Sequence, residues 1–332
     1  MITFRCVYSV ADIPDEWDRI AEEYFQKTPF LQHAETYNPC KQRYYLCFDE
    51  EKLVSAAIMY SLRLDILTFV KVKSPLKMNI VGIPCSVSSP GIFGTSDAVE
   101  SLKKYIFETE KGFVLFLNLK EKSEATSHAH GHTLPSVVMS NNFSNWDDYL
   151  VSMRSSYRRR LRRIFQPEDK LHFEKIPNIS FNEKMYLQYL NVYKKSSGKL
   201  EMLTLDFFRN LPSEFILTVC YFKKKIIGWN MALAHRDTYY FFLGGIDYNE
   251  NKIFNTYFLL LSIIIKDGID RKAKIIELGQ TAEIPKMRMG GKLHHRFMEA
   301  HHSNKVYNKL IKMFGSSLEY KRKLEDLSLI HI

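Results

Sequence analysis

The pattern of apolar and polar positions predicts strands and helices along the whole chain. Apolar residues recur every three or four positions in residues 146–165, which is the spacing of an amphipathic helix. Asp147 and Asp148 lie near its start and arginines near its end, as the helix dipole favours. Further strands are predicted at 172–176, 215–222, 226–235, 238–246 and 274–279, and helices at 182–195, 204–211 and 254–267. Antiparallel strands followed by a helix and a strand indicate an α+β fold with mixed sheets flanked by helices.

Two predicted hairpins share one design and indicate an internal duplication. Residues 50–62 and 223–235 each contain a charged turn, a lysine, two branched apolar residues, a small residue and a strand, and each follows another strand. The alternative is that any two hairpins resemble each other. We predict an N-terminal domain at 1–140 and a C-terminal domain at 141–326. Residues 327–332 (LSLIHI) match a translated sequencing-library end, so we assign them no structure.

Composition and charge indicate which partners the protein could bind and in which compartment it acts. The 332 residues are 45% hydrophobic and carry a net charge of +10, which either favours polyanionic partners such as phosphates and nucleic acid or only keeps the protein in solution. The five cysteines are scattered and lack a CxxC pair, which indicates a reducing compartment. Since we recognise no signal peptide and no apolar run long enough to cross a bilayer, we expect a cytoplasmic protein.

A run of arginines marks the predicted helix at 146–165. Arg158 and Arg162 are four residues apart, as are Arg159 and Arg163, so each pair lies on one helix face. Like charges at that spacing destabilise a helix unless negative groups neutralise them. Arginine can bind phosphate through two parallel hydrogen bonds. The functional interpretation is a contact to phosphate or to an RNA backbone. The alternative is a solvated face paired with acidic neighbours.

Two glycine-containing segments follow predicted strands. Gly244 and Gly245 end the strand at 238–246, where a bulge can expose backbone N–H groups that stabilise an oxyanion; the alternative is a plain strand end. Lys286 and Arg288 follow the strand at 274–279, and Gly290 and Gly291 would let the backbone approach a ligand; the alternative is a turn.

The remaining chemistry-bearing residues give weaker signals. His128, His130 and His132 would share one face of an extended segment, but a polar loop explains them better than zinc does, so we predict no metal site. The adjacent pairs His294/His295 and His301/His302 are interpreted as structural. The sequence contains no GxSxG, Walker, GxGxxG, HExxH or paired CxxC motif, which removes the usual support for those enzyme classes.

Three segments resemble FemAB-like and BioF2-like double acyltransferases of the GNAT superfamily. They are WDDYLVSMRSSYRRRLRR from residue 146, YYFFLGGIDYNENKIFNTYFLLLSIIIKDGI from residue 239 and IELGQTAEIPKMRMGGKL from residue 276. The resemblance implies two tandem GNAT-like domains and transfer of an acyl or aminoacyl group from acyl-CoA, a carrier or aminoacyl-tRNA to an amine. That amine would belong to a small molecule or a cell-envelope precursor, and no covalently bound cofactor is implied.

The resemblance also suggests roles for individual residues. Lys286 matches the lysine of the family's lysine-to-glycine turn, and Gly290 matches its glycine. Two family features are missing: an acyl-CoA phosphate loop before the helix at 254–267, where NENKIF stands, and the helical hairpin insertion of the tRNA-dependent members. The donor therefore stays open.

We expect amine attack on a thioester or ester carbonyl. Lys286, Gly244 and Gly245 would stabilise the oxyanion, and Asp247 is the candidate base. The set expected to bind substrates and phosphates is Arg158, Arg162, Gln280, Arg288, Gly290 and Gly291. The alternative is a non-catalytic protein of the same fold that binds RNA or a phosphorylated ligand.

Overall fold

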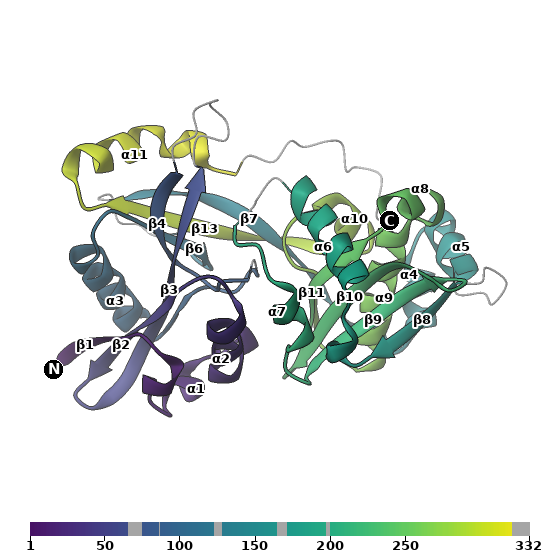
Figure 1. Cartoon of the computed structure of the whole chain (residues 1–332), viewed down its shortest axis with the longest axis horizontal. Helices are drawn as coiled ribbons and strands as arrows, with labels where there is room; N and C mark the ends of the chain where they lie inside the picture. The colour runs from purple at the N-terminus through teal and green to yellow at the C-terminus, as the bar shows by residue number, and fades with distance from the viewer. Residues whose placement is uncertain (66–74, 86, 123–127, 165–170, 197–199, 321–332) are drawn as a thin grey trace. The chain divides into compact units, whose positions relative to one another are not determined.

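A computed structural model describes residues 1–65, 75–85, 87–122, 128–164, 171–196 and 200–320. The chain forms two compact units, which Figure 1 shows by element. Unit 1 contains residues 1–135, 200–204 and 295–320, and unit 2 contains residues 136–196 and 205–294. Residues 136–140, predicted in the N-terminal domain, lie in unit 2. Residues 200–204 and 295–320, predicted in the C-terminal domain, lie in unit 1. Residues 327–332 lie outside the described part of the chain.

The elements of unit 1 occur mostly in the first half of the chain. They are β1 (Ile2–Val7), α1 (Trp17–Ile20), α2 (Thr28–Tyr37), β2 (Gln42–Asp49), β3 (Lys52–Asp65), β4 (Pro75–Val81), β5 (Ile92–Gly94), α3 (Ser96–Thr109), β6 (Phe113–Leu119) and α11 (Lys305–Leu318). Two long strands, β7 (Ala129–Ser140) and β13 (Lys292–His302), each have residues in both units.

Unit 2 contains the remaining elements. They are α4 (Trp146–Ser152), α5 (Ser155–Ile164), β8 (Leu171–Ile176), α6 (Glu183–Lys195), α7 (Leu205–Arg209), β9 (Phe215–Phe222), β10 (Lys225–His235), β11 (Thr238–Ile246), α8 (Tyr248–Phe254), α9 (Thr256–Asp270), β12 (Ile275–Glu277) and α10 (Glu283–Arg288). Apart from the predicted helix at 146–165, the predicted strands and helices of this half are therefore confirmed, with shifted ends and with α8 and α10 added.

The two units repeat one topology. In unit 1, β1, β2, β3 and β4 pair antiparallel in order, β6 pairs parallel with β4, and β13 pairs antiparallel with β6. In unit 2, β8 to β11 pair antiparallel in order, β12 pairs parallel with β11, and β7 pairs antiparallel with β12. Both predicted hairpins are present, and each turn holds a residue in the left-handed region, Glu50 (φ 55°) and Lys223 (φ 55°). The predicted duplication is thus confirmed at the level of strand order.

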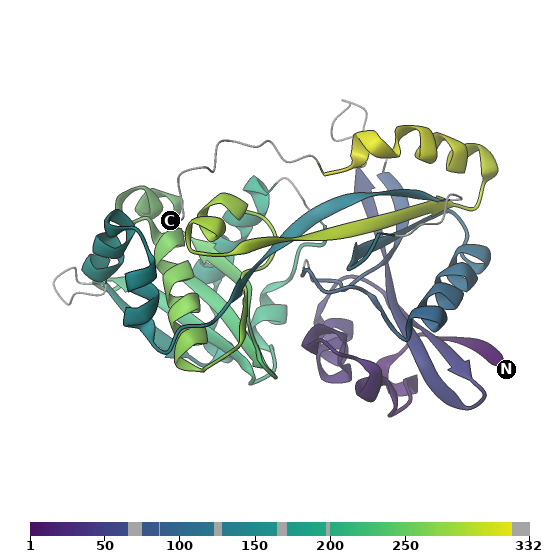
Figure 2. The ribbon, with the colours of Figure 1, turned by 180° about the vertical axis from the view of Figure 1, so that it is seen from behind.

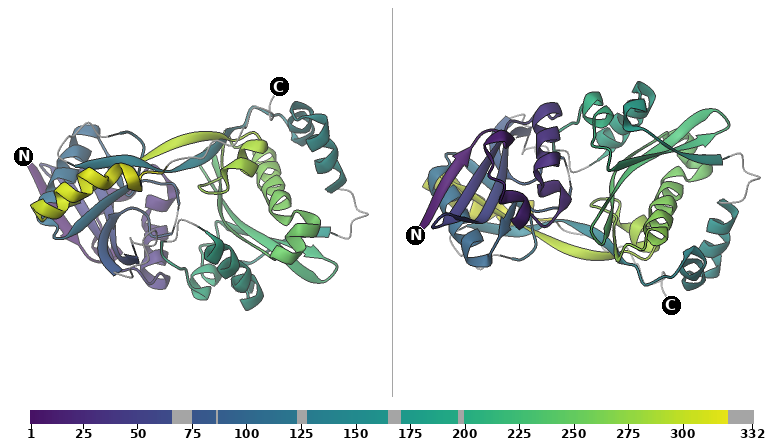
Figure 3. Two further views of the ribbon diagram at one scale, coloured as in Figure 1. Left: turned by 90° about the horizontal axis from the view of Figure 1, so that it is seen from above. Right: turned by 90° about the horizontal axis from the view of Figure 1, so that it is seen from below.

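Helices cover both faces of the strands of unit 2. Figure 3 shows α9 on one face and α6 with α7 on the other. On the α6 face, the Trp229 indole Nε1 donates to the Met185 carbonyl at 2.9 Å. On the α9 face, a side chain at Gly268 would come within 2.7 Å of Ile276, so the glycine lets the helix pack closely on β12.

The predicted helix at 146–165 is two helices, so that prediction was wrong. Met153, between α4 and α5, is extended (φ −87°, ψ 153°), and its N–H donates to Leu150 O at 3.2 Å. The apolar spacing continues across the break because both helices pack beside α9 in one core cluster (Figure 2). Three serines surround the break, and serine favours caps over helix interiors; they are Ser152, Ser155 and Ser156.

Candidate functional site

The pairing of β11 with β12 ends before the predicted glycine pair is reached. The parallel pairing joins only Thr238–Tyr240 to Ile275–Glu277 in the described structure. The register of β11 against β10 then shifts, because Met231 pairs with Leu243 and Ala232 with Phe241, which leaves Phe242 as an extra residue. Such a bulge redirects the backbone of the longer strand. The rest of β11 therefore runs beside β10 alone.

The two glycines of β11 differ in what they do. A side chain at Gly245 would lie 2.4 Å from the indole nitrogen of Trp229, so the tryptophan needs a glycine there. The Asp247 N–H donates to Ile227 O at 3.0 Å, which makes these two residues a hydrogen-bonded pair. By the alternation of antiparallel strands, Gly244 then occupies a position whose N–H points away from β10. Gly244 directs a backbone donor to the side on which β12 has parted.

Lys286 lies in α10 and is buried, with 2% of its surface exposed. Its Nζ donates to Gln280 O at 2.7 Å and lies 5.8 Å from the centre of the Phe241 ring. Burial lowers the pKa of Lys286 to about 7, although the nearby carboxylates Glu277 and Glu283 oppose that shift. Taking a charged amine out of water favours its neutral form. Near neutral pH, Lys286 can therefore accept a proton.

Gly279 lies between Lys286 and β11 and has φ 73°, in the region that favours glycine. An added side chain there would begin 3.9 Å from Lys286 Nζ and 3.6 Å from Phe241 O. The Leu278 N–H donates to Val137 O at 2.8 Å and the Val137 N–H donates to Gly279 O at 3.1 Å, so β7 holds the end of β12 in place. The structure thus brings Lys286 and the Gln280 carbonyl together beside the parted edge of β11.

Asp247, the predicted base, has other partners. Its side chain caps α8 by accepting from the Asn249 N–H at 3.0 Å, and it pairs with Lys225 at 3.0 Å. Burial would raise the pKa of Asp247, but the Lys225 contact and the backbone hydrogen bonds outweigh it and hold this pKa below its ordinary value. A carboxylate held in this way is a weak proton acceptor.

The glycine pair after α10 has a backbone role of its own. The Gly291 N–H donates to Lys286 O at 3.2 Å and the Gly290 N–H to Met287 O at 3.0 Å, which is the Schellman pattern of a helix end. Gly290 has φ 98°, in the region that favours glycine. A side chain at Gly291 would lie 2.4 Å from Val137. The predicted turn is therefore present, and it ends α10 directly after Lys286 and Arg288.

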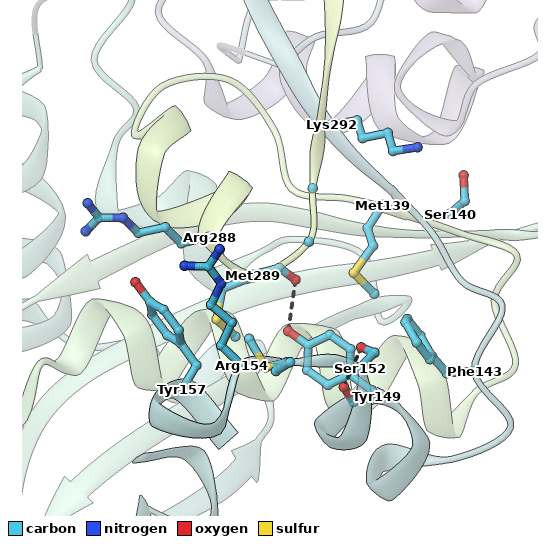
Figure 4. A pocket seen from close by; sticks show the side chains of 13 residues that line it. Met139, Ser140, Phe143, Tyr149, Ser152, Arg154, Tyr157, Arg288, Met289 and Lys292 are labelled. Atoms are coloured by element: carbon cyan, nitrogen blue, oxygen red, sulfur yellow. Dashed lines mark hydrogen bonds between the residues drawn. The ribbon is translucent and has the colours of Figure 1, made fainter. Parts of the chain in front are cut away.

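A cavity of about 290 Å³ adjoins this helix end. Arg288, Gly290 and Gly291 line it, as do Arg154 and Lys292, whose individual contribution the sequence did not reveal. Figure 4 shows the Arg154 side chain running from the start of α5 toward α10, close to Arg288, while Lys292 and Ser140 lie at the other end. Lys286 does not line the cavity, so the predicted residues fall into two groups.

Arg158 and Arg162, also predicted to bind phosphate, are not among the cavity-lining residues. Arg158 Nη1 donates to Val151 O at 3.2 Å, and Arg162 is exposed. Arg154 lines the cavity instead, at the break between α4 and α5. A continuous-helix prediction conceals such a residue, and the clustered serines were the signal that could have indicated it.

The predicted histidine face lies in unit 1. His128 Nδ1 lies 2.7 Å from Glu299 Oε1, and Lys103 Nζ lies 2.6 Å from Glu299 Oε2. His132 contacts the ring of His295. Across the described residues, no three His, Cys, Asp or Glu side chains are grouped as a metal site would need. From the adjacent pairs, His295 and His301 make ring contacts with His132 and His128, in keeping with the structural role predicted for them.

Solved structures similar to this chain cover most of its length. FemX aligns with 87% of this chain and 94% of its own, at a TM-score of 0.53 and 10% identity. The C-terminal domain of a protein named as a lysylphosphatidylglycerol synthetase from Agrobacterium fabrum aligns with 90% of this chain and 92% of its own, at a TM-score of 0.54 and 10% identity. A tandem GNAT protein from the clavulanic acid biosynthesis pathway aligns with 92% of this chain and 99% of its own, at a TM-score of 0.52 and 6% identity. The chain has a tandem GNAT fold.

The sequence alone does not reveal this likeness in a direct comparison. No family model matches it, and no curated protein does either. The tandem GNAT fold confirms the fold class expected from the three quoted segments. Within the described residues, the helices are too short or too polar to cross a membrane.

Proposed function

We propose that this protein is an N-acyltransferase or aminoacyltransferase. The observation that carries the proposal is the meeting of a buried, readily deprotonated Lys286 with the parted edge of β11, where Gly244 directs a backbone N–H outward. Polarised backbone donors beside a proton acceptor are what acyl transfer to an amine requires. The similarity in fold to FemX and to a tandem GNAT protein supports the same class of reaction.

The reaction joins the acceptor nitrogen to the donor's acyl carbon. The amine attacks the carbonyl carbon, the N–C bond forms, and the C–S or C–O bond of the donor breaks. The Gly244 N–H donates to the oxyanion that develops, and Lys286 Nζ takes the proton that the attacking nitrogen loses and passes one to the leaving group. This role for Lys286 replaces the predicted oxyanion contact, since a neutral amine contributes less charge. Asp247, held by Lys225, has less support as the base.

The donor is an acyl or aminoacyl group activated on CoA, a carrier or tRNA. We infer an amine-bearing small molecule or cell-envelope precursor as acceptor, acting in the cytoplasm. Residues 248–254 form α8, and it ends next to the start of α9, where a phosphate loop would be needed to bind CoA in the usual way. A protein that only binds RNA or a phosphorylated ligand has less support, because it gives Lys286 no role.

A thermal-shift panel followed by a transfer assay tests the proposal. Acyl-CoAs, aminoacyl-tRNAs and nucleotide-linked amines are added to the full chain, because a ligand that binds the folded state raises its melting temperature. The donor and acceptor that give shifts are then assayed for product by mass spectrometry. We expect K286M to lower kcat by at least about 100-fold, the usual contribution of a positioned acid or base. K224M, at an exposed position, is the matched control.

The pH profile separates the two roles of Lys286. With a proton acceptor, kcat/KM of the wild type rises with pH through about 7 and then levels, and this rise is absent from K286M. Product formed by K286M at the wild-type rate would exclude Lys286 from the reaction. A flat profile in the wild type would exclude it as the base.

A further inference from the structure

We propose that the cavity between the start of α5 and the end of α10 binds a phosphate group that carries a ring or a short alkyl chain. The inference concerns binding by unit 2 and stands apart from the proposed transfer reaction, because Lys286 does not line this cavity. It rests on the charge, the apolar walls and the size of the cavity.

The charges in the cavity lack acidic partners within the described residues. Arg154, Arg288 and Lys292 line it, the lining contains no Asp or Glu, and none of the three cations has an ion pair in the described part of the chain. Arg154 and Arg288 lie at the same end of the cavity, where Tyr157 adds a hydroxyl (Figure 4). Like charges held together are unfavourable unless an anion joins them.

One donor of the Arg154 side chain has no hydrogen-bond acceptor among the described residues. Its Nε is buried and has no partner among the described residues. A buried N–H without an acceptor costs roughly 1–3 kcal/mol, and more when the group is charged. The break between α4 and α5 sets the start of α5 at this residue, since the Arg158 N–H donates to Arg154 O at 3.0 Å. The Arg154 side chain is thus fixed beside the cavity with no acidic partner among the described residues.

The number of charges favours phosphate over carboxylate. A phosphate monoester carries about −1.5 to −2 charges near pH 7 and offers three acceptor oxygens. Guanidinium groups bind these oxygens in a bidentate manner, which suits a cavity lined by two arginines. A carboxylate would neutralise one of three cations and leave the rest of the cavity strongly positive.

The rest of the lining is apolar and small. The apolar part of the lining is made by the side chains of Met139, Phe143, Tyr149 and Met289. The Tyr149 hydroxyl is already used, because it donates to Met289 O at 2.9 Å, so the ring offers a face and not a donor. At about 290 Å³ the cavity is at the lower limit of ligand sites, which run to roughly 1,000 Å³. It suits a phosphate with a ring or short chain better than an entire coenzyme.

Calorimetric titration of the full chain tests the proposal with four probes. They are phenyl phosphate, hexyl phosphate, inorganic phosphate and benzoate. We expect phenyl or hexyl phosphate to bind at least about tenfold more tightly than inorganic phosphate or benzoate. Tighter binding of the phenyl ester indicates a ring such as a nucleoside, and tighter binding of the hexyl ester indicates a lipid-like chain. Equal binding of benzoate, or no binding of either ester, would overturn the assignment.

Variants locate the binding at this cavity. R154Q and R288Q should each weaken phenyl phosphate at least about tenfold, the loss of one charge-assisted hydrogen-bonding group. R159Q on the same helix removes one exposed charge outside the cavity and should bind as the wild type does. Circular dichroism confirms that each variant is folded. Unchanged affinity in both folded cavity variants, or an equal loss in R159Q, would show that the phosphate binds elsewhere.

Discussion

Replacing Lys286 by methionine should change how stability depends on pH. The amine is buried, and its pKa falls from an ordinary value near 10.4 to about 7. The unfolded chain therefore binds one more proton than the folded chain between these values, so wild-type stability rises with pH across this window. Below pH 7 the cost of burying the amine is fully present, and above about pH 10 it is absent. The shift of roughly 3.5 pKa units corresponds to about 5 kcal/mol in total.

The measurement is the difference in the free energy of unfolding between wild type and K286M. Urea denaturation at pH 6, 7, 8 and 9, followed by fluorescence and circular dichroism, gives this difference. We expect it to shift in favour of the wild type by about 1.4 kcal/mol per pH unit above pH 7. Methionine also loses the hydrogen bond to Gln280 O, which adds about 1 kcal/mol at every pH and leaves the slope unchanged.

The control and the refuting result follow from the same slope. K224M removes an exposed lysine, so its difference from the wild type should stay flat between pH 6 and 9. A flat difference for K286M as well would mean that the amine remains charged in the folded protein throughout this range. That result would remove the physical basis for its role as proton acceptor, whatever the enzyme's activity.

Three further changes test the packing around both units. G245A should destabilise the protein by about 2 kcal/mol in urea denaturation, because its methyl group would meet the Trp229 indole; wild-type stability would contradict the close approach. E299Q in unit 1 should cost about 3 kcal/mol, because it leaves the buried Lys103 amine with only the exposed Glu100 as a charged partner, and a loss below 1 kcal/mol would refute that. A282G should raise the midpoint of thermal unfolding, because glycine adopts the left-handed backbone of Ala282 (φ 47°) without the strain of about 1 kcal/mol that alanine carries. A lower midpoint would show that no strain is stored there.

The positions of the strands were largely predictable from the sequence, because period-two apolar alternation and turn residues are local signals, whereas their order in the sheet was not. Both hairpins, the apolar helix α9 and the strand before the lysine–glycine segment were recovered in this way. The break after Ser152 was missed because apolar spacing stays in phase across it, and the exchange of β7 and β13 between units was missed because long-range pairing leaves no local trace. Tertiary contacts decided both.

The site was predictable in its residue types but not in its grouping. Lys286, Arg288 and the glycine pair were identified as one segment, yet α10 puts Lys286 on its buried side and Arg288 at the cavity. A six-residue helix was not expected there, and helical geometry sends residues two apart to different faces. Arg154 is one of six arginines between residues 154 and 163, and its role in the cavity could not be separated from the rest before the helix break was known.

The turn before α10 supports a functional role for Lys286 more strongly than the glycines after it do. The Schellman pattern accounts for Gly290 and the contact with Val137 accounts for Gly291, so neither requires a ligand. Thr281 (φ 60°) and Ala282 (φ 47°) also have left-handed backbones, but they carry side chains that strain this conformation. Glycine would occupy both positions without strain. Each costs on the order of 1–3 kcal/mol, and such strain persists where surrounding contacts fix the chain, often at functional sites. Here the strained turn is what aims the Gln280 carbonyl at the Lys286 amine.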